Sequence, residues 1–290
     1  MSLGIALLQQ VIEMRGELRR NSGYLARQEL GRIYERMAQD PRRLDPFGYK
    51  VYSQNDEDGI LAEIFRRIGI EQGTFCEVGV ENGLECNSLF LLHKGWRGAW
   101  IEGNDQQEAP IREKFGGLMS AGRLSVGIGF ASPDNIDEVL TQSLAAIGCD
   151  AATLDLLSID IDGMDIYLLE ALTLAPKVIC IEYNAKFPPP VSKRPVFDPE
   201  YRWRGTDYMG SSLVALAEVA TAKGYALVAT NVTGANAFFV RGDLLADRFA
   251  DGLPLAELYN PPRYHLFSDH FISAAGHRAD FGPYTDLVAN

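Results

Sequence analysis

The stretch Thr74-Phe-Cys-Glu-Val-Gly-Val-Glu-Asn-Gly83 decides the fold of this chain. Its apolar residues predict a short buried strand that ends in a glycine turn, followed by a helix. Because Gly79 and Gly83 have no Cβ atom, backbone N–H groups of this turn can approach a ligand closely. Glu77 precedes the turn and no Lys-Ser/Thr pair follows it, so the turn suits a ligand with a cationic or amino-acid end rather than a phosphate.

A second apolar strand, Ala99-Trp-Ile-Glu-Gly-Asn104, ends in an acidic residue. It follows the glycine turn at about the 20-residue spacing expected in doubly wound nucleotide-binding folds. Glu102 then lies at the carboxyl end of the strand, where such folds accept hydrogen bonds from ribose hydroxyls. An NAD-dependent dehydrogenase also has an acid here, but the closer Gly-x-Gly-x-x-Gly spacing that its pyrophosphate needs is missing.

Composition and charge exclude several classes of function. The 290 residues are 47% hydrophobic and 23% charged, as in one large globular α/β domain with additions. A net charge of −12 argues against a nucleic-acid partner, which requires basic surface. No segment approaches the roughly 18 apolar residues of a membrane span, and we expect no signal peptide. Four cysteines without metal-binding spacing favour a reducing cytoplasm.

The first 50 residues are predicted to form a helical arm outside a main domain of residues 51–290. Apolar residues recur at helical spacing from 7 to 37, and Asn21-Ser-Gly23 is predicted to split them into two helices. Residues 1–53 carry nine Lys/Arg and six Asp/Glu, a balance of +3 that contrasts with −15 (18 against 33) in the rest. We favour an arm that packs on the main domain or on a second subunit, where the second case gives a homodimer. The alternative is an arm that lies on an anionic membrane surface.

The remaining pattern alternates strands and helices, which predicts a doubly wound sheet of the Rossmann-like type. Strands are expected at 74–79, 98–102, 123–127, 155–160, 177–182, 225–231 and 236–241, with helices at 60–68, 84–93, 108–117, 134–147, 164–173 and 210–223. The link between the last two strands is too short for a helical crossover, so they should form an antiparallel hairpin. The expected fold is therefore a seven-stranded, mostly parallel sheet closed by a hairpin, whereas a dinucleotide dehydrogenase would continue with parallel units.

Acidic side chains gather at two neighbouring strand ends. In Leu156-Leu-Ser-Ile-Asp-Ile-Asp-Gly163, strand alternation places Asp160 and Asp162 on the same side. The next strand ends with Glu182 and Asn184. Because the ends of adjacent strands meet at the ligand crevice of an open sheet, these four side chains predict an all-oxygen site for a hard cation such as Mg²⁺.

In this interpretation Asp160, Asp162 and Glu182 are the catalytic groups, and the cation lowers the pKa of an acceptor hydroxyl. Two alternatives remain open. One of the acids is a metal-free general base, or Asp162 or Asp165 caps the next helix while Glu182 binds backbone or substrate.

The segment from Ala185 to Gly210 is unusually long for a loop in a compact domain, which predicts a functional lid. Trp and Tyr faces stack on sugar rings, and Arg and Lys bind carboxylate or phosphate groups. The substrate-binding candidates in this loop are Lys186, Arg202, Trp203 and Tyr208. A contact between subunits is the alternative role for such a loop.

Six segments, taken in this order, resemble the FkbM-type methyltransferases, which depend on S-adenosylmethionine (SAM) and have the class I methyltransferase fold. They are Tyr52-Ser-Gln-Asn-Asp-Glu-Asp-Gly-Ile60, Glu77-Val-Gly-Val-Glu-Asn-Gly83, Gly95-Trp-Arg-Gly-Ala-Trp-Ile-Glu-Gly-Asn104, Leu157-Ser-Ile-Asp-Ile-Asp-Gly-Met-Asp165, Ile181-Glu-Tyr-Asn184 and Val232-Thr-Gly-Ala-Asn-Ala-Phe-Phe-Val240. The resemblance runs from about Tyr52 to Arg241. It implies methyl transfer to a hydroxyl of a sugar, polysaccharide or secondary metabolite.

The resemblance also implies where SAM binds. The backbone at Gly79 and Gly83 would hold the amino-acid portion, with Glu77 near its ammonium group. Glu102 would bind the ribose, the 125–132 turn would border the adenine, and Asp160 would border the cofactor. Ser53, Gln54 and Asp58 either cover the cofactor or mark the start of a helix.

Two further classes of function stay open at this stage. A binding or scaffold protein could retain the cofactor pocket without transfer, although acids at four strand-end positions argue against it. A dinucleotide oxidoreductase is disfavoured by the glycine spacing and by the expected hairpin.

Overall fold

The computed structural model describes residues 3–267 and 278–281. The helices are α1 (Leu3–Met37), α2 (Glu57–Ile68), α3 (Leu89–His93), α4 (Glu108–Ser120), α5 (Ile136–Ala145), α6 (Asp165–Ala171), α7 (Leu213–Ala222) and α8 (Leu255–Leu258). The strands are β1 (Thr74–Val78), β2 (Arg97–Glu102), β3 (Leu124–Ile128), β4 (Leu156–Ile159), β5 (Val178–Glu182), β6 (Tyr225–Thr230) and β7 (Asn236–Arg241).

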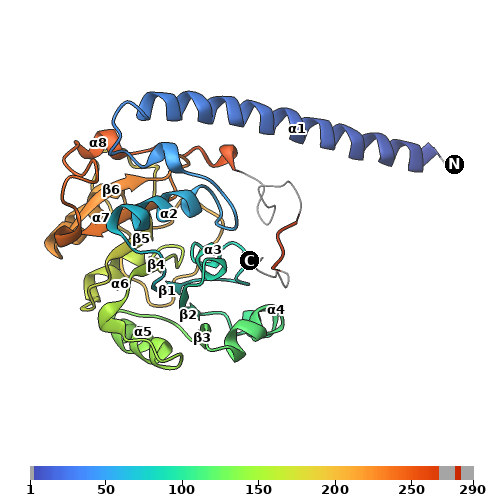
Figure 1. Cartoon of the computed structure of the whole chain (residues 1–290). Helices are drawn as coiled ribbons and strands as arrows, with labels where there is room; N and C mark the ends of the chain where they lie inside the picture. The colour runs from blue at the N-terminus through green and yellow to red at the C-terminus, as the bar shows by residue number, and fades with distance from the viewer. Residues whose placement is uncertain (1–2, 268–277, 282–290) are drawn as a thin grey trace, which may run out of the picture.

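The seven strands form one sheet in the order β3-β2-β1-β4-β5-β7-β6 (Figure 1). The first five are parallel, and β7 is antiparallel to both β5 and β6. This confirms the predicted doubly wound sheet and its closing hairpin. The winding direction changes between β1 and β4, and ligands of such sheets bind outside the carboxyl ends of the strands at that switch point.

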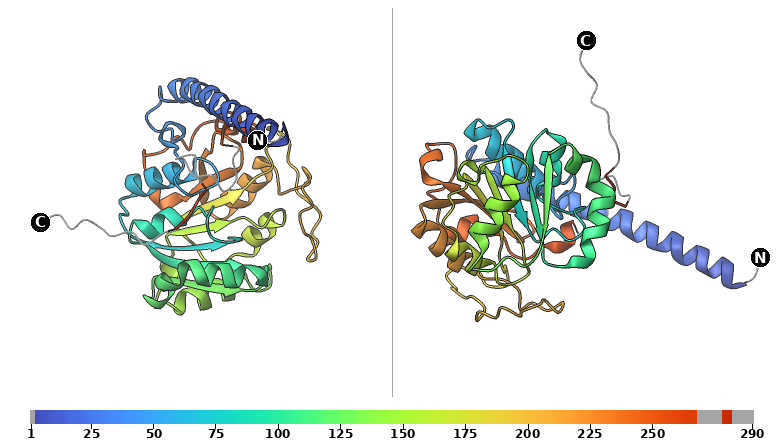
Figure 2. Two further views of the ribbon diagram at one scale, coloured as in Figure 1. Left: turned by 90° about the vertical axis from the view of Figure 1, so that its right-hand side faces the viewer. Right: turned by 90° about the horizontal axis from the view of Figure 1, so that it is seen from below.

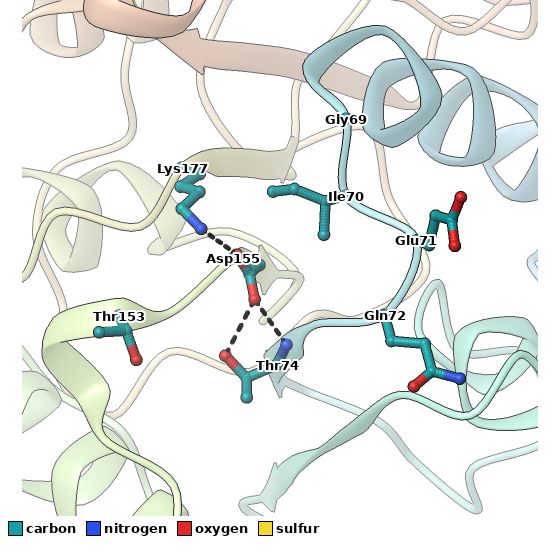
Figure 3. Close-up of a pocket in the computed structure, with 8 residues that line it drawn as sticks. All are labelled: Gly69, Ile70, Glu71, Gln72, Thr74, Thr153, Asp155 and Lys177. Carbon is teal, nitrogen blue, oxygen red and sulfur yellow. Dashed lines mark hydrogen bonds and ion pairs between the residues drawn. The ribbon is translucent and has the colours of Figure 1, made fainter.

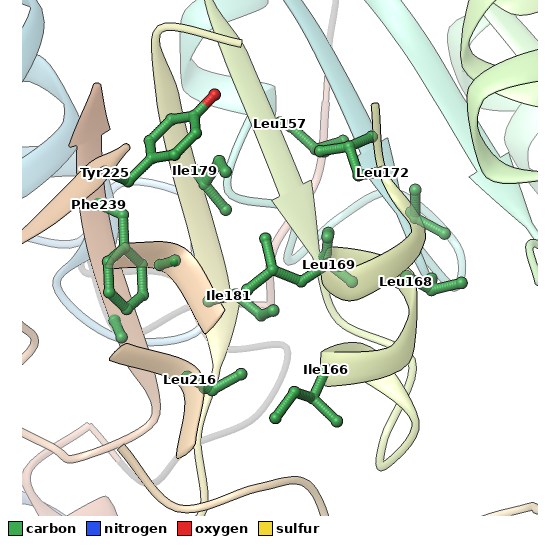
Figure 4. Packing of buried hydrophobic residues seen from close by; sticks show 14 of the residues in the cluster. Leu157, Ile166, Leu168, Leu169, Leu172, Ile179, Ile181, Leu216, Tyr225 and Phe239 are labelled. Atoms are coloured by element: carbon green, nitrogen blue, oxygen red, sulfur yellow. The ribbon is translucent and has the colours of Figure 1, made fainter. Parts of the chain in front are cut away.

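Each face of the sheet is covered by helices because successive strand residues point to opposite faces. Leu157, Ile179 and Ile181 pack with α5, α6 and α7 on one face. Figure 4 shows these strand residues facing Leu169 of α6 and Leu216 of α7. The neighbouring residues on the same strands point the other way, into a second core with α2, α3 and α4. The inner parallel strands β1, β2, β4 and β5 are therefore buried on both sides, which explains their largely apolar sequences, whereas the edge strand β3 is mostly half-buried.

The N-terminal arm is one continuous helix, α1, so the predicted break near Asn21-Ser-Gly23 is wrong. A single glycine lowers helix stability by only about 1 kcal/mol relative to Ala, and no proline interrupts the segment. The last turns of α1 are anchored because Ile33 packs against Val232 and Leu266. The rest of the helix extends away from the sheet (Figures 1 and 2). No helix in the described part of the chain is both long and apolar enough to cross a membrane.

The amino ends of β1, β4 and β5 are tied together by Asp155 (Figure 3). Its carboxylate accepts a hydrogen bond from the Thr74 N–H at 2.7 Å and pairs with Lys177 Nζ at 2.6 Å. These residues line a surface depression, but they satisfy one another there. The depression lies at the opposite end of the strands from Asp160 and Glu182, so it is separate from the predicted site.

Candidate functional site

The glycine turn after β1 presses directly against the segment that follows β4. A Cβ atom on Gly79 would lie 1.6 Å from the carbonyl oxygen of Asp160, and the Gly79 φ of +84° lies in the left-handed region. Gly83 has a φ of +82°, and a Cβ there would lie within 3 Å of the Trp100 and Phe115 rings. Both glycines are therefore required by the packing of the protein itself. Their role in holding a ligand stays a prediction.

Glu77 lies under the glycine turn with 2% of its surface exposed. Its carboxylate accepts hydrogen bonds from the Asn87 N–H at 2.8 Å, from the Ser88 N–H at 2.9 Å and from the Ser88 hydroxyl. Burial raises the pKa of Glu77 to about 7 despite these bonds. The hydrogen bonds to Glu77 hold Asn87 and Ser88 in a turn. The helix predicted at 84–93 therefore begins only at Leu89. The position of Glu77 beside a SAM ammonium group stays a prediction.

Glu102, at the end of β2, connects two strand ends. One carboxylate oxygen accepts the N–H groups of Val80 at 3.1 Å and Glu81 at 2.7 Å, and the other accepts the Asn104 N–H at 2.8 Å. The side chain is 7% exposed. Glu102 thus holds the glycine turn against β2, at the position expected for a ribose ligand.

The residues before α2 form a bonded helix start. Asp58 Oδ2 accepts the N–H groups of Val51 and Tyr52 at 2.7 Å and of Ser53 at 2.9 Å. In return, the Asp58 N–H donates to Ser53 Oγ at 3.2 Å. This geometry favours the helix-start interpretation for Ser53 and Asp58. Gln54 is exposed, and its carbonyl accepts Lys50 Nζ at 2.9 Å.

Asp160, Asp162 and Glu182 come together as predicted, with one carboxylate oxygen from each lying within 4.8 Å of the others. The route differs from the prediction, because β4 ends at Ile159 and strand alternation does not reach these residues. Asp162 has a φ of +59°, so a left-handed turn directs it back toward Asp160.

Asp165 holds this turn in place. Its carboxylate accepts the N–H groups of Ile161 at 2.8 Å and of Gly163 at 2.9 Å. Asp162 and Asp165 were the two candidates for capping the next helix. Asp165 is the one that bonds to backbone N–H groups, whereas Asp162 lies in the acid cluster. Burial, followed by the charge of the neighbouring acids, raises the pKa of Asp160 and of Glu182. Glu182 is 8% exposed, and its Oε2 has no hydrogen-bond partner.

Asn184 anchors the long loop. Its Nδ2 donates to the carbonyl oxygens of Asp207 at 2.9 Å and Met209 at 2.6 Å, and its Oδ1 accepts the Lys186 N–H at 3.1 Å. The side chain thus holds the two ends of the loop together beside Glu182. The role of Asn184 as a metal ligand stays a prediction.

The long loop folds over the carboxyl ends of the strands. The Tyr201 ring lies 2.6 Å from where a Cβ on Gly163 would be, so it covers the turn that carries Asp162. The Arg202 guanidinium lies 4.2 Å from the centre of the Phe130 ring, which itself covers Gly103 beside Glu102. These contacts fit the predicted lid. The sequence predicted roles for the 125–132 turn and the long loop as segments, but it did not single out Phe130 or Tyr201 within them.

The other loop candidates lie at the surface. Lys186 pairs with Asp207 at 2.7 Å, and Trp203 Nε1 donates to the Thr206 carbonyl at 2.6 Å. Trp203 and Tyr208 are exposed. A cavity of about 260 Å³ within the loop is lined by residues that include Arg202 and Tyr208. Arg202 contacts Phe130, which belongs to the 125–132 turn predicted to border the adenine.

Sequence reasoning also missed a network beneath the site. Glu57 Oε1 accepts hydrogen bonds from the side-chain amides of Asn231 and Asn236. Two of the segments that carried the family resemblance, 52–60 and 232–240, therefore lie against each other. Both segments carry the family resemblance, and the sequence analysis found no other sign that they would be in contact.

No protein-family model matches this chain, and no curated protein matches it at a significant level. Solved structures are similar in fold. One is a protein of Staphylococcus aureus provisionally assigned as a caffeoyl-CoA O-methyltransferase (14% identity, 64% of this chain and 82% of that chain covered, TM-score 0.42). Another is the O-methyltransferase TomG of Streptomyces achromogenes, involved in tomaymycin synthesis and solved with SAM (16% identity, 63% and 78% covered, TM-score 0.39).

A third similar structure is the N-terminal domain of EvdMO1, solved in the presence of S-adenosylhomocysteine (SAH) and D-fucose (13% identity, 72% and 94% covered, TM-score 0.39). The fold assignment rests on the strand order and directions of this chain. They define the Rossmann-like fold of class I methyltransferases, with five parallel strands and a closing hairpin.

Proposed function

We propose that this protein is a SAM-dependent O-methyltransferase of the FkbM type that acts on a hydroxyl of a saccharide or glycan-like acceptor. The observation that carries the proposal is the convergence of Asp160, Asp162 and Glu182 at the carboxyl edge of the sheet, in contact with the glycine turn at Gly79. Ligands of doubly wound sheets bind at this edge.

The donor set fits SAM. An ammonium and a sulfonium group suit a site built from carboxylates, and the buried Oε2 of Glu182 has no partner of its own. The residues that would hold the cofactor are Gln54, Glu77, Gly79, Gly83, Glu102 and Asp160. SAM held there would supply an electrophilic methyl group, and the acceptor hydroxyl would lose its proton as its oxygen takes that group.

The same acids fit a divalent cation. Like charges this close are unfavourable unless a proton or cation lies between them, and carboxylate oxygens are preferred Mg²⁺ ligands. We propose that Asp160, Asp162, Glu182 and Asn184 would hold it. It would supply polarisation of the acceptor hydroxyl. We propose that Glu182 accepts the hydroxyl proton and that Tyr201, which covers the turn carrying Asp162, limits the access of water there.

The lid supports a saccharide acceptor. Trp203 and Tyr208 present exposed aromatic faces suited to sugar rings. Lys186 and Arg202 add positive charge next to an acidic site, which suits an acceptor that carries carboxylate or phosphate. All four side chains belong to the segment that folds over the acid cluster.

We also propose that α1 pairs with α1 of a second copy to form a homodimer. In its outer part Leu7, Val11, Met14, Leu18 and Leu25 are all more than half exposed. From Leu7 to Leu18 these residues are four, three and four positions apart, as in a coiled-coil seam, and Leu25 lies one heptad beyond Leu18. Free cysteines at all four positions are consistent with a reducing cytoplasm.

The test is calorimetric titration of the protein with SAH, before and after chelation of divalent cations and after addition of Mg²⁺. We expect SAH binding in the wild type and in Asp160→Asn, with methyl transfer lost in the variant. Asp247→Asn, at an exposed position, serves as the matched control and should behave as wild type. Absence of SAH binding under every condition would reject the proposed function. Full transfer after chelation would reject the metal.

A further inference from the structure

Two buried polar side chains near Glu182 each have one oxygen atom without a hydrogen-bond partner in the described part of the chain. They are Ser211, through its Oγ, and Asn236, through its Oδ1, and they are 1% and 4% exposed. Asn236 is the cross-strand neighbour of Glu182 in the β5–β7 pairing. Ser211 follows Gly210, whose Cβ position lies 3.8 Å from Glu182 Oε2. The two residues that carry these unpartnered atoms therefore adjoin Glu182 in the fold, one across the sheet and one next to Gly210.

Neighbouring bonds hold both side chains in place. Asn236 Nδ2 donates to Glu57 Oε1 at 2.9 Å, so its amide oxygen is the atom left without a partner. The Ser211 carbonyl accepts the Asn184 N–H at 2.8 Å, which fixes the backbone from which the hydroxyl extends. An unpaired buried polar atom lowers stability by about 1–3 kcal/mol, and native proteins keep few of them. Their position next to the acid cluster indicates a ligand that supplies the missing bonds.

Tyr264 lies close to the turn that leads into β7, the strand that carries Asn236. The N–H of the preceding residue, Arg263, donates to the Thr233 carbonyl at 2.8 Å, which places Tyr264 next to the turn between β6 and β7. Burial and the nearby Glu182 carboxylate raise the pKa of Tyr264 to about 12. Its ring is 43% exposed, so a face is available for the apolar side of a sugar ring.

We propose that Ser211 and Asn236 bind the hydroxyl adjacent to the one that is methylated, so that the acceptor is a vicinal diol of a saccharide. This inference rests on the proposed methyl transfer beside Glu182. The Asn236 amide oxygen accepts hydrogen bonds and cannot donate them, whereas the Ser211 hydroxyl can donate one. A neighbouring hydroxyl can donate to Asn236 and accept from Ser211, but a deoxy carbon or a methyl ether leaves the Asn236 oxygen unpaired. Sites built to bind a hydroxyl reject analogues that lack it far more strongly than apolar pockets discriminate by size.

The experiment uses the full chain, labelled SAM and a panel of methyl glycopyranosides, followed by the monodeoxy and mono-O-methyl analogues of the best acceptor. We expect the analogue without the adjacent hydroxyl to lose about 100-fold or more in kcat/KM. Ser211→Ala and Asn236→Ala should lower kcat/KM for the diol by about 10-fold or more, mainly through KM, and should add little to the loss seen with the analogue.

Ser192→Ala, an exposed serine earlier in the same loop, is the matched control and should leave the discrimination unchanged. Ser211→Ala should not lower the unfolding midpoint of the free protein, because its hydroxyl has no partner there. A destabilised Ser211→Ala, or variants that discriminate as wild type does, would overturn the inference.

The inference and the proposed function fail in different ways. SAH binding without transfer to any diol in the panel overturns the vicinal-diol inference and leaves the methyltransferase proposal in place. Absence of SAH binding removes the proposed function, and the inference with it.

Discussion

Glu57 Oε1 and Asn231 Nδ2 lie 2.7 Å apart in a buried hydrogen bond that joins residues 174 positions apart in the sequence. The same Glu57 oxygen accepts Asn236 Nδ2 at 2.9 Å. Asn231 Oδ1 in turn accepts the N–H groups of Ala235 and Asn236 at 2.9 Å. One carboxylate at the start of α2 therefore fixes the turn between β6 and β7. Through Asn236 it also orients the side chain that faces Glu182.

Removal of this carboxylate should destabilise the fold strongly. Glu57→Ala leaves the buried amides of Asn55, Asn231 and Asn236 without their shared acceptor, so we expect a loss of about 3 kcal/mol or more in unfolding free energy. Glu57→Gln keeps that oxygen and loses the bond from the Asn55 N–H, which should lower stability by about 1 kcal/mol. Urea unfolding measures both, and equal losses in the two variants would contradict the network.

Asp58 should make stability depend on pH. Burial raises its pKa to about 6, so the folded protein holds this proton to a higher pH than the unfolded chain does. The stabilisation from protonated Asp58 is then complete below about pH 4 and is lost as the pH rises through 6. A pKa raised by about two units corresponds to about 3 kcal/mol.

Asp58→Asn keeps an oxygen for the three backbone N–H groups and cannot ionise. We expect it to equal the wild type near pH 4 and to be up to about 3 kcal/mol more stable at pH 7.5. Urea unfolding between these pH values is the measurement, with exposed Asp247→Asn as the control. Both proteins should keep the further decline contributed by Glu77, whose pKa is raised to about 7. Parallel pH profiles for wild type and Asp58→Asn would refute the assignment.

Gly79→Ala should disrupt the site itself. Its Cβ would overlap the Asp160 carbonyl at 1.6 Å, and its φ of +84° disfavours any side chain. We expect a loss of about 3 kcal/mol or more, from overpacking and backbone strain together, with loss of SAH binding. Gly122→Ala is the matched control, because its φ of +64° is similar but no atom lies within 4 Å of the added Cβ. It should lose only about 1 kcal/mol, and calorimetry with SAH should find its binding intact.

The outer half of α1 should determine the oligomeric state. We expect the wild type to sediment as a dimer and Leu18→Glu, in the centre of the proposed seam, as a monomer with an unchanged domain unfolding midpoint. Gln9→Glu, on the opposite side of the same helix, is the control and should remain dimeric. A wild type that sediments as a monomer but binds vesicles of anionic lipid would instead support the membrane-surface interpretation.

The meeting of the candidate residues at one edge of the sheet was predictable from sequence. The glycine turn and Asp160 directly follow apolar strands, Glu102 and Glu182 end such strands, and the parallel order brings these carboxyl ends together. Asp162 illustrates the limit of this reasoning. It joins Asp160 through a left-handed backbone angle rather than through the strand alternation from which the contact was predicted.

The sequence by itself determined the seven strands, their mostly parallel order and the closing hairpin, because these depend on hydrophobic periodicity and on loop length, which are local properties of the chain. Only the tertiary structure decided that Glu77 bonds to the start of α3, that Glu57 holds Asn231 and Asn236, and that Ser211 lies beside Glu182. These relationships join residues that are distant in sequence. Their partners are set by which buried donors and acceptors remain unpaired after the sheet has formed, and no local pattern records that outcome.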